Sequence, residues 1–219
     1  MFSITQRRLA TAGMALCMAT GAASGASGPR MVPSSAVRAF VSWAIADRAG
    51  TPDRPWAVLD KSGARLHVFD ARGALLASSP VLLGAAVGDD SVPGIGDRRI
   101  ADIRPEEKTT PAGRFATEPG RNLQDEDIVW VDYDAAISLH RVRPLAGERR
   151  LERLASATAR DNRISYGCIN VPAAFYDRWI RPGFGRVAGW LYVLPETRTV
   201  DAQFHINPGG YHPPSEKPR

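Results

Sequence analysis

One cysteine in this chain lies in a segment whose residue types suit nucleophilic catalysis. Cys168 belongs to the stretch 163–172, which reads Arg-Ile-Ser-Tyr-Gly-Cys-Ile-Asn-Val-Pro. A thiol has an ordinary pKa of about 8.5, so a base with a pKa near 6.5, such as an imidazole, is needed to form the thiolate at neutral pH. Main-chain amides around Gly167 and Cys168 would then hold the oxyanion that forms after attack on a carbonyl carbon.

The neighbours of Cys168 indicate how the thiol would be activated. We expect a helix over 172–180, so that Cys168 lies just before a helix N-terminus, where N–H groups and the helix dipole favour the thiolate. Gly167 has no side chain and would let a substrate carbonyl approach the main chain. Ser165 and Asn170 would add side-chain hydrogen bonds beside the nucleophile.

The base must come from one of four histidines. His205 and His212 fall in or near the C-terminal tail, and we expect His67 to be a surface residue of an early strand. His140 ends the alternating run 137–140, opposite its apolar face, which makes it the candidate base. From the residues alone, a hydrogen-bonded structural histidine remains the alternative. The scattered histidines give no metal-ligand spacing, and we expect neither a metal nor another cofactor.

Hydrophobic patterning from Trp56 onwards predicts a mainly β fold with short helices (α+β), arranged as an antiparallel sandwich or barrel-like sheet. Gly- and Asp-rich turns separate the strands, and the Gly-, Pro- and charge-rich stretch 84–127 is expected to be irregular, and either disordered or functional. Helices are expected over 148–160, mostly solvated, and over 172–180. The expected strands are 56–60, 65–70, 74–83, 113–116, 128–132, 136–140 and 190–194.

The first 26 residues read as an export signal. Arg7 and Arg8 precede an uncharged run, and small residues follow, with cleavage expected after Ala26. The run is too short and too rich in small residues for a comfortable membrane span, although an uncleaved anchor is the alternative. Cleavage would remove Cys17 and leave Cys168 without an internal disulfide partner, which favours a reactive, buried or intermolecular role for it.

Four segments are therefore expected along the chain. They are a signal (1–26), an extension with a short helix capped by Ser34 or Ser35 (27–55), a catalytic domain (56–195) and a C-terminal tail (196–219). The composition, with 44% hydrophobic and 23% charged residues, is that of a soluble globular protein. The formal charge of +5 comes without a Lys/Arg cluster, so nucleic-acid binding has no specific support.

Three ordered features resemble the L,D-transpeptidase catalytic domain: the motif Ser-Tyr-Gly-Cys-Ile-Asn at 165–170, His140 upstream on a strand, and the earlier turn Thr-Pro-Ala-Gly at 110–113. The resemblance covers roughly 55–195. It implies that family's β-sandwich or open barrel, with one or two helices flanking the cysteine loop. Arg141 stands where the family usually has glycine, and the long spacing between histidine and cysteine makes 143–162 look like an insertion, which could form a lid.

The resemblance also implies a reaction. Cys168 would attack the carbonyl of the third residue of a peptidoglycan stem peptide, release the terminal D-alanine and form a thioester. An amine acceptor would then give a crosslink, whereas water would give an L,D-carboxypeptidase or a crosslink hydrolase. A catalytically inactive wall-binding domain is the third possibility.

Further roles follow from the same resemblance. The main-chain carbonyl of Arg141 would orient His140, and Tyr166 and Arg163 would border the substrate groove. Arg163 would pair with a substrate carboxylate, or else be a solvated surface charge. We expect an exported, periplasmic monomer that has no stable membrane span and is a target of carbapenems.

Overall fold

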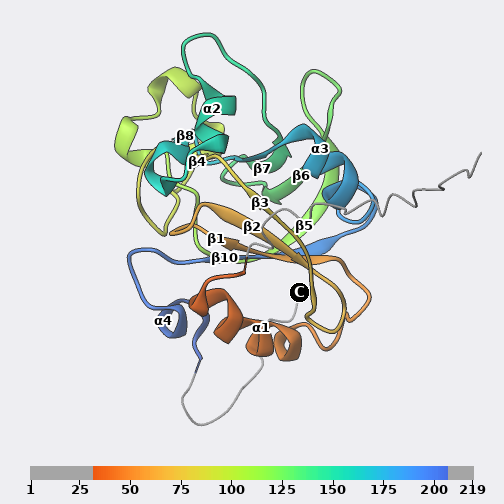
Figure 1. The fold of residues 1–219 in the computed structure, drawn as a ribbon. Coiled ribbons are helices and arrows are strands. Elements are labelled where there is room, and N and C mark those ends of the chain that lie inside the picture. The colour runs from red at the N-terminus through yellow and green to blue at the C-terminus, as the bar shows by residue number, and fades with distance from the viewer. Residues whose placement is uncertain (1–31, 207–219) are drawn as a thin grey trace, which may run out of the picture. The chain divides into compact units, whose positions relative to one another are not determined.

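Ten strands and four α-helices organise residues 32–206, the part of the chain that the computed structural model describes (Figure 1). The strands are β1 (Trp56–Asp60), β2 (Arg65–Phe69), β3 (Leu75–Pro80), β4 (Leu83–Gly84), β5 (Gly113–Arg121), β6 (Asp127–Asp132), β7 (Ile137–Arg141), β8 (Arg163–Ser165), β9 (Ile169–Val171) and β10 (Gly189–Leu194). The helices are α1 (Ser35–Asp47), α2 (Arg150–Ala155), α3 (Ala173–Phe175) and α4 (Val200–Phe204). Short 3-10 turns span Ile95–Asp97, Ile100–Asp102, Pro105–Glu107 and Ala159–Asn162, and a π turn spans Tyr176–Ile180. The predicted export signal and His212 lie outside the described residues.

Eight of the strands form one sheet in the order β3-β2-β1-β10-β5-β6-β7-β9. Neighbours are antiparallel except for the pairs β1–β10 and β7–β9, which are parallel. The long strand β5 joins two halves of the sheet, because Gly113–Thr117 pairs with β10 and Glu118–Arg121 pairs with β6. The remaining strands, β4 and β8, form a small parallel pair, and Leu82 beside β4 bridges to Asn170 of β9.

Side chains from both halves of the sheet meet in one core. Strands β1, β2 and β10 contribute Ala57, Leu59, Leu66, Val68, Leu191 and Val193, and strands β6, β7 and β9 contribute Val129, Val131, Ile137, Leu139, Ile169 and Val171. Strands that are distant in the sheet order can share one cluster only if the sheet curls over itself. The predicted mainly β, sandwich-like or open-barrel fold is therefore confirmed.

Helices α1 and α4 cover the opposite face of the first half of the sheet (Figure 1). The expected helix in the N-terminal extension is present, and its N-cap is Ser34, whose Oγ accepts from the N–H of Val37 at 3.3 Å. Phe40 of α1 packs against Tyr192 of β10 and Phe204 of α4. Helix α4 was not anticipated, since its residues were assigned to the tail.

Helix α2 is shorter than expected, but the segment 148–160 is mostly exposed as predicted, with only Arg150 and Leu154 buried. The helix ends at Ala155, because the hydroxyl of Ser156 accepts from the N–H of Thr158 and bonds the carboxylate of Asp161, which stabilises a turn in place of more helix. Leu154 is buried in a small cluster with Leu82 and Val142. The predicted insertion therefore packs on the domain through this apolar face.

The expectation for His67 is wrong. Its side chain is buried, on the face of β2 opposite to Leu66 and Val68, which both enter the main core. Burial lowers the pKa of His67 to about 4, a shift that Asp60 partly offsets and Arg65 reinforces. Strand β5, at Gly113–Arg121, is longer than the predicted 113–116.

The helices within residues 32–206 lack the combination of length and apolar character that crossing a bilayer requires.

Candidate active site

Cys168 and His140 are brought together by the parallel pairing of β7 and β9. Leu139 lies opposite Ile169, and His140 lies opposite Asn170. Because side chains alternate along a strand, the apolar residues of both strands enter the core and the intervening ones take the other face. That second face carries Ser138, His140, Cys168 and Asn170.

The thiol of Cys168 is half-buried and has polar atoms around it. Its Sγ lies 3.6 Å from Oγ of Ser138 and 3.7 Å from the carbonyl oxygen of Ala136. Burial by itself would raise the pKa of the thiol, but the hydrogen bond and positive charge of His140, together with hydrogen bonds from Ser138, outweigh it and lower the pKa. The site thus favours a thiolate.

His140 is oriented by the main chain. Its Nδ1 lies 2.7 Å from the carbonyl oxygen of Arg141. A carbonyl oxygen can only accept, so Nδ1 is the donor and Nε2 remains as the nitrogen that can take a proton from the thiol. This is the contact that the resemblance implied for the residue after the histidine.

The side chain of Arg141 fixes that carbonyl in place. Its Nη1 lies 2.9 Å from Oδ1 of Asp127, its Nε lies 3.0 Å from Oδ1 of Asp177, and its guanidinium lies 4.2 Å from the ring centroid of Tyr176. The hydrogen bond from Arg141 lowers the pKa of the Asp127 carboxyl, although burial opposes it. The arginine that departs from the family pattern is therefore an anchor for the strand end.

Ser165 and Asn170 hold the main chain of the cysteine loop. The Oγ of Ser165 donates to the carbonyl of Cys168 at 2.7 Å and accepts from the N–H of Gly167 at 3.1 Å. The Nδ2 of Asn170 donates to the same Cys168 carbonyl at 3.1 Å, and its Oδ1 accepts from Nη1 of Arg150 on α2 at 2.8 Å. Helix α2 therefore reaches the loop through a buried side-chain contact.

Two expectations about the cysteine loop need correction, one on the helix after Cys168 and one on the role of Gly167. Cys168 does not precede a helix, because strand β9 follows it and α3 begins only at Ala173, so no helix dipole acts on the thiol directly. Gly167 is required by its own packing: its φ is +132°, and a Cβ there would lie 2.6 Å from the oxygen of Thr109 and 2.5 Å from Cδ1 of Ile137.

The amides near the thiol are not equally available. The N–H of Gly167 already donates to Ser165, whereas the N–H of Cys168 makes no hydrogen bond within residues 32–206. Cys168 N–H is therefore the donor that a substrate oxygen could use.

Tyr166 and Arg163 differ in accessibility. Tyr166 is exposed beside the loop, with Nζ of Lys108 4.0 Å from its ring centroid. Arg163 is not the solvated surface charge considered as one alternative, because its side chain is only 11% exposed and forms an ion pair with Glu196. A guanidinium held in this way is not free to meet a substrate carboxylate.

Two cavities flank the pair of side chains. One, of about 450 Å³, is lined by His140, Arg141, Asp127 and Ala173, among others. The second, of about 520 Å³, is lined by Trp130, Tyr133, Asp134 and by Ala136, whose carbonyl faces the thiol. His140 itself thus lines the first cavity, whereas the second is lined by a residue whose carbonyl oxygen contacts the thiol, and Cys168 lines neither.

Sequence reasoning missed Ser138 and Thr110 as individual contributors. Ser138 could have been found, because it lies two residues before His140 and so must share its face of the strand. Thr110 donates from Oγ1 to the carbonyl of Gly167 at 2.8 Å, a contact that only the fold reveals. Within residues 32–206, no three His, Cys, Asp or Glu side chains gather as they would around a metal ion.

No family model and no curated protein matches this sequence. Among solved structures, the chain is similar to the crystal structure of the L,D-transpeptidase (residues 123–326) from Xylanimonas cellulosilytica DSM 15894, at 15% identity and a TM-score of 0.40, over 64% of this chain and 60% of that one. It is also similar to the NMR structure of the catalytic domain of the E. faecium L,D-transpeptidase, at 16% identity and a TM-score of 0.33, over 65% of this chain and 98% of that one. The match thus spans less than two thirds of the first chain, and neither similarity establishes a family for this protein.

Proposed function

We propose that this protein is an exported L,D-transpeptidase of the bacterial cell wall that acts through Cys168 and His140. The observation that carries the proposal is the arrangement of three groups: the pairing of β7 with β9 puts the Cys168 thiol and the His140 imidazole on one face, and the Arg141 carbonyl oxygen lies 2.7 Å from Nδ1 of that imidazole. A passive wall-binding domain would need none of these.

In the proposed reaction, Nε2 of His140 takes the thiol proton, and Sγ attacks the carbonyl carbon of the third residue of a stem tetrapeptide. The N–H of Cys168 donates to the oxyanion. The intermediate collapses when the carbon–nitrogen bond to D-alanine breaks, and the imidazolium gives its proton to the leaving amine. An acceptor amine then attacks the thioester and loses a proton to His140, which frees the thiol and leaves a new amide bond.

The first test uses matched variants of the purified protein. Incubation with a carbapenem should leave a covalent adduct on the wild-type protein, measured by intact mass, because the probe acylates an activated thiol. Cys168→Ala should show no adduct, and His140→Gln should form it at least tenfold more slowly. His205→Gln replaces an exposed histidine directly after α4 and should match the wild type. Equal adduct formation by Cys168→Ala and the wild type would overturn the proposal.

The second test separates transfer from hydrolysis. Muropeptides with tetrapeptide stems would be incubated with the protein, and the products would be identified by mass spectrometry. Crosslinked dimers with loss of D-alanine support the transpeptidase. Tripeptide products alone would instead indicate an L,D-carboxypeptidase that uses the same two side chains.

A further inference from the structure

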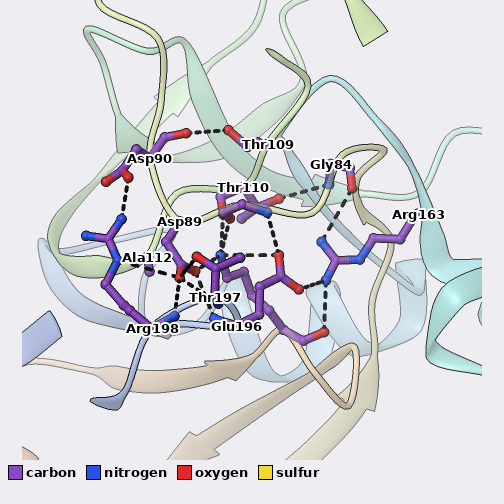
Figure 2. Close-up of polar contacts among 12 residues, drawn as sticks. Gly84, Asp89, Asp90, Thr109, Thr110, Ala112, Arg163, Glu196, Thr197 and Arg198 are labelled. Carbon is purple, nitrogen blue, oxygen red and sulfur yellow. Dashed lines mark hydrogen bonds and ion pairs between the residues drawn. The ribbon is translucent and has the colours of Figure 1, made fainter. Parts of the chain in front are cut away.

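Lys61 and Asp89 have no solvent contact and form an ion pair inside a polar cluster. Figure 2 shows Asp89 and several of its neighbours in this cluster. The Nζ of Lys61 donates to the Gly88 carbonyl at 2.6 Å, to Oδ1 of Asp89 at 2.7 Å and to the Thr110 carbonyl at 3.0 Å. An ammonium group has three protons, so these three acceptors satisfy it completely. Burial of the charge is tolerated for that reason.

Asp89 ties the cluster to the segment after β10. Its carboxylate accepts from the N–H groups of Glu196 and Thr197, each at 2.8 Å, and from that of Arg198 at 3.1 Å, as Figure 2 shows. Burial alone would raise the pKa of this carboxyl, but the hydrogen bonds from Lys61, Thr197 and the main chain lower it below its usual value. Asp89 is therefore ionised at neutral pH, as the ammonium of Lys61 requires.

Thr110 links this cluster to the cysteine loop, because it bonds both Lys61 and Gly167. The Thr110 carbonyl accepts from Nζ of Lys61. The Oγ1 of Thr110 accepts from the N–H of Gly84 at 2.9 Å and donates to the Gly167 carbonyl at 2.8 Å. The hydroxyl proton is thus directed at a single acceptor. Thr110 is almost fully buried, so water does not compete for that bond.

The Gly167 carbonyl and the Cys168 N–H belong to the same planar peptide group. Fixing the oxygen of a peptide group fixes the direction of its N–H, and a hydrogen bond to the oxygen polarises the N–H into a stronger donor. We infer that Thr110, anchored by the Lys61–Asp89 pair, is a positioning residue that aims the Cys168 N–H at the oxyanion of the bound substrate. This inference rests on the proposed function only in assigning acyl chemistry to Cys168.

The test compares two reactions of the same sulfur. Acylation of Cys168 by p-nitrophenyl acetate forms an oxyanion, whereas alkylation by iodoacetamide displaces iodide and forms none. Thr110→Val keeps the shape of the side chain and removes the hydroxyl. We expect acylation to slow by about tenfold to a hundredfold, since removing an oxyanion donor outright costs about 10²–10³, while the rate and pH profile of alkylation stay unchanged.

Two variants serve as controls, and circular dichroism with thermal melting verifies that each is folded. Thr110→Ser retains the hydroxyl and should restore acylation to within a few-fold of the wild type. Thr109→Val removes a neighbouring hydroxyl that donates to the Asp90 carbonyl instead, at 2.7 Å, and should acylate normally (Figure 2). Acylation of folded Thr110→Val at the wild-type rate, or an equal loss of acylation and alkylation, overturns the inference. Because the probe is not a wall peptide, inactivity toward muropeptides would refute the proposed substrate without affecting this result.

Discussion

The contact between His140 and the Arg141 carbonyl has a chemical advantage over a contact with a carboxylate. A carbonyl oxygen does not titrate, so the acceptor for the Nδ1 proton persists at every pH at which the protein is folded. Substitution of a side chain cannot remove it either. The tetrad Ser138, His140, Cys168 and Asn170 is therefore built from two strands whose geometry, more than any single side chain, sets the reacting atoms.

Ser138 offers a direct test of how the thiol is tuned. Ser138→Ala removes a hydroxyl 3.6 Å from the Sγ of Cys168, and its hydrogen bond is one of the influences that lower the thiol pKa. We expect the pKa of Cys168 to rise, because the thiolate loses one of its hydrogen-bond donors. The pH dependence of iodoacetamide alkylation measures it. Ser42→Ala, on the exposed face of α1, is the control, and an unshifted profile in Ser138→Ala would contradict this account.

Much of this residue-level picture could be predicted from sequence. The alternation at 137–140 placed His140 opposite the apolar face, and the motif at 165–170 singled out Cys168. The roles of Gly167 and Arg163 could not be predicted, because they depend on Thr109, Ile137 and Glu196, which only the fold brings near. The sequence pattern around a residue indicates which face of its strand it lies on, but not which distant residues pack against it.

Strand β2 carries a buried histidine whose Nδ1 has no hydrogen-bond partner within the described residues. In the unfolded chain the imidazole titrates near pH 6.5, whereas in the folded protein the pKa of His67 is about 4. The unfolded state therefore binds the proton first as the pH falls. Stability contributed by neutral His67 is complete above about pH 6.5 and decreases toward pH 4.

His67→Leu should remove this acid sensitivity. We expect the free energy of unfolding of the wild type to fall by ~3 kcal/mol more than that of the variant between pH 7 and pH 4. Urea unfolding at a series of pH values measures the difference. His205→Gln, an exposed histidine, should keep the wild-type dependence. If the free energy of unfolding fell equally with pH in the wild type and His67→Leu, protonation of the buried imidazole would not destabilise the folded protein, and this account would be wrong.

At the level of elements, strands were easier to predict than helices. Strand β1 was predicted with its exact bounds, because Trp56–Asp60 is a short apolar run between turn residues. The helix predicted over 148–160 was too long, because charged residues occur in both helices and turns. The hydrogen bond between Ser156 and Asp161 stabilises a turn after Ala155 instead of further helix. Strand β9 was missed because three residues between Cys168 and Pro172 carry too little periodicity.

At the scale of the whole molecule, α1 covers the outer face of strands β1, β2 and β10, opposite the main core. Phe40 is buried there between Tyr192 and Phe204, so Phe40→Ala should leave a cavity and lower the free energy of unfolding by about 3–5 kcal/mol. Chemical denaturation measures the loss. Ser42→Ala, on the solvent side of the same helix, should change it by less than about 0.5 kcal/mol. A loss below 1 kcal/mol in Phe40→Ala would mean that α1 contributes little to the domain.

The parallel pairing of β1 with β10 sets the order in which the sheet can be completed. Trp56 pairs in register with Trp190, so the central strand β1 lacks one of its two neighbours until nearly all of the described chain has emerged from the ribosome. Pairing across so long a stretch of chain is slow to form, because loop closure must precede the contacts that stabilise it. A nascent chain of this protein consequently stays open late in its synthesis, a state that suits recognition by chaperones before the last strand closes the centre of the sheet.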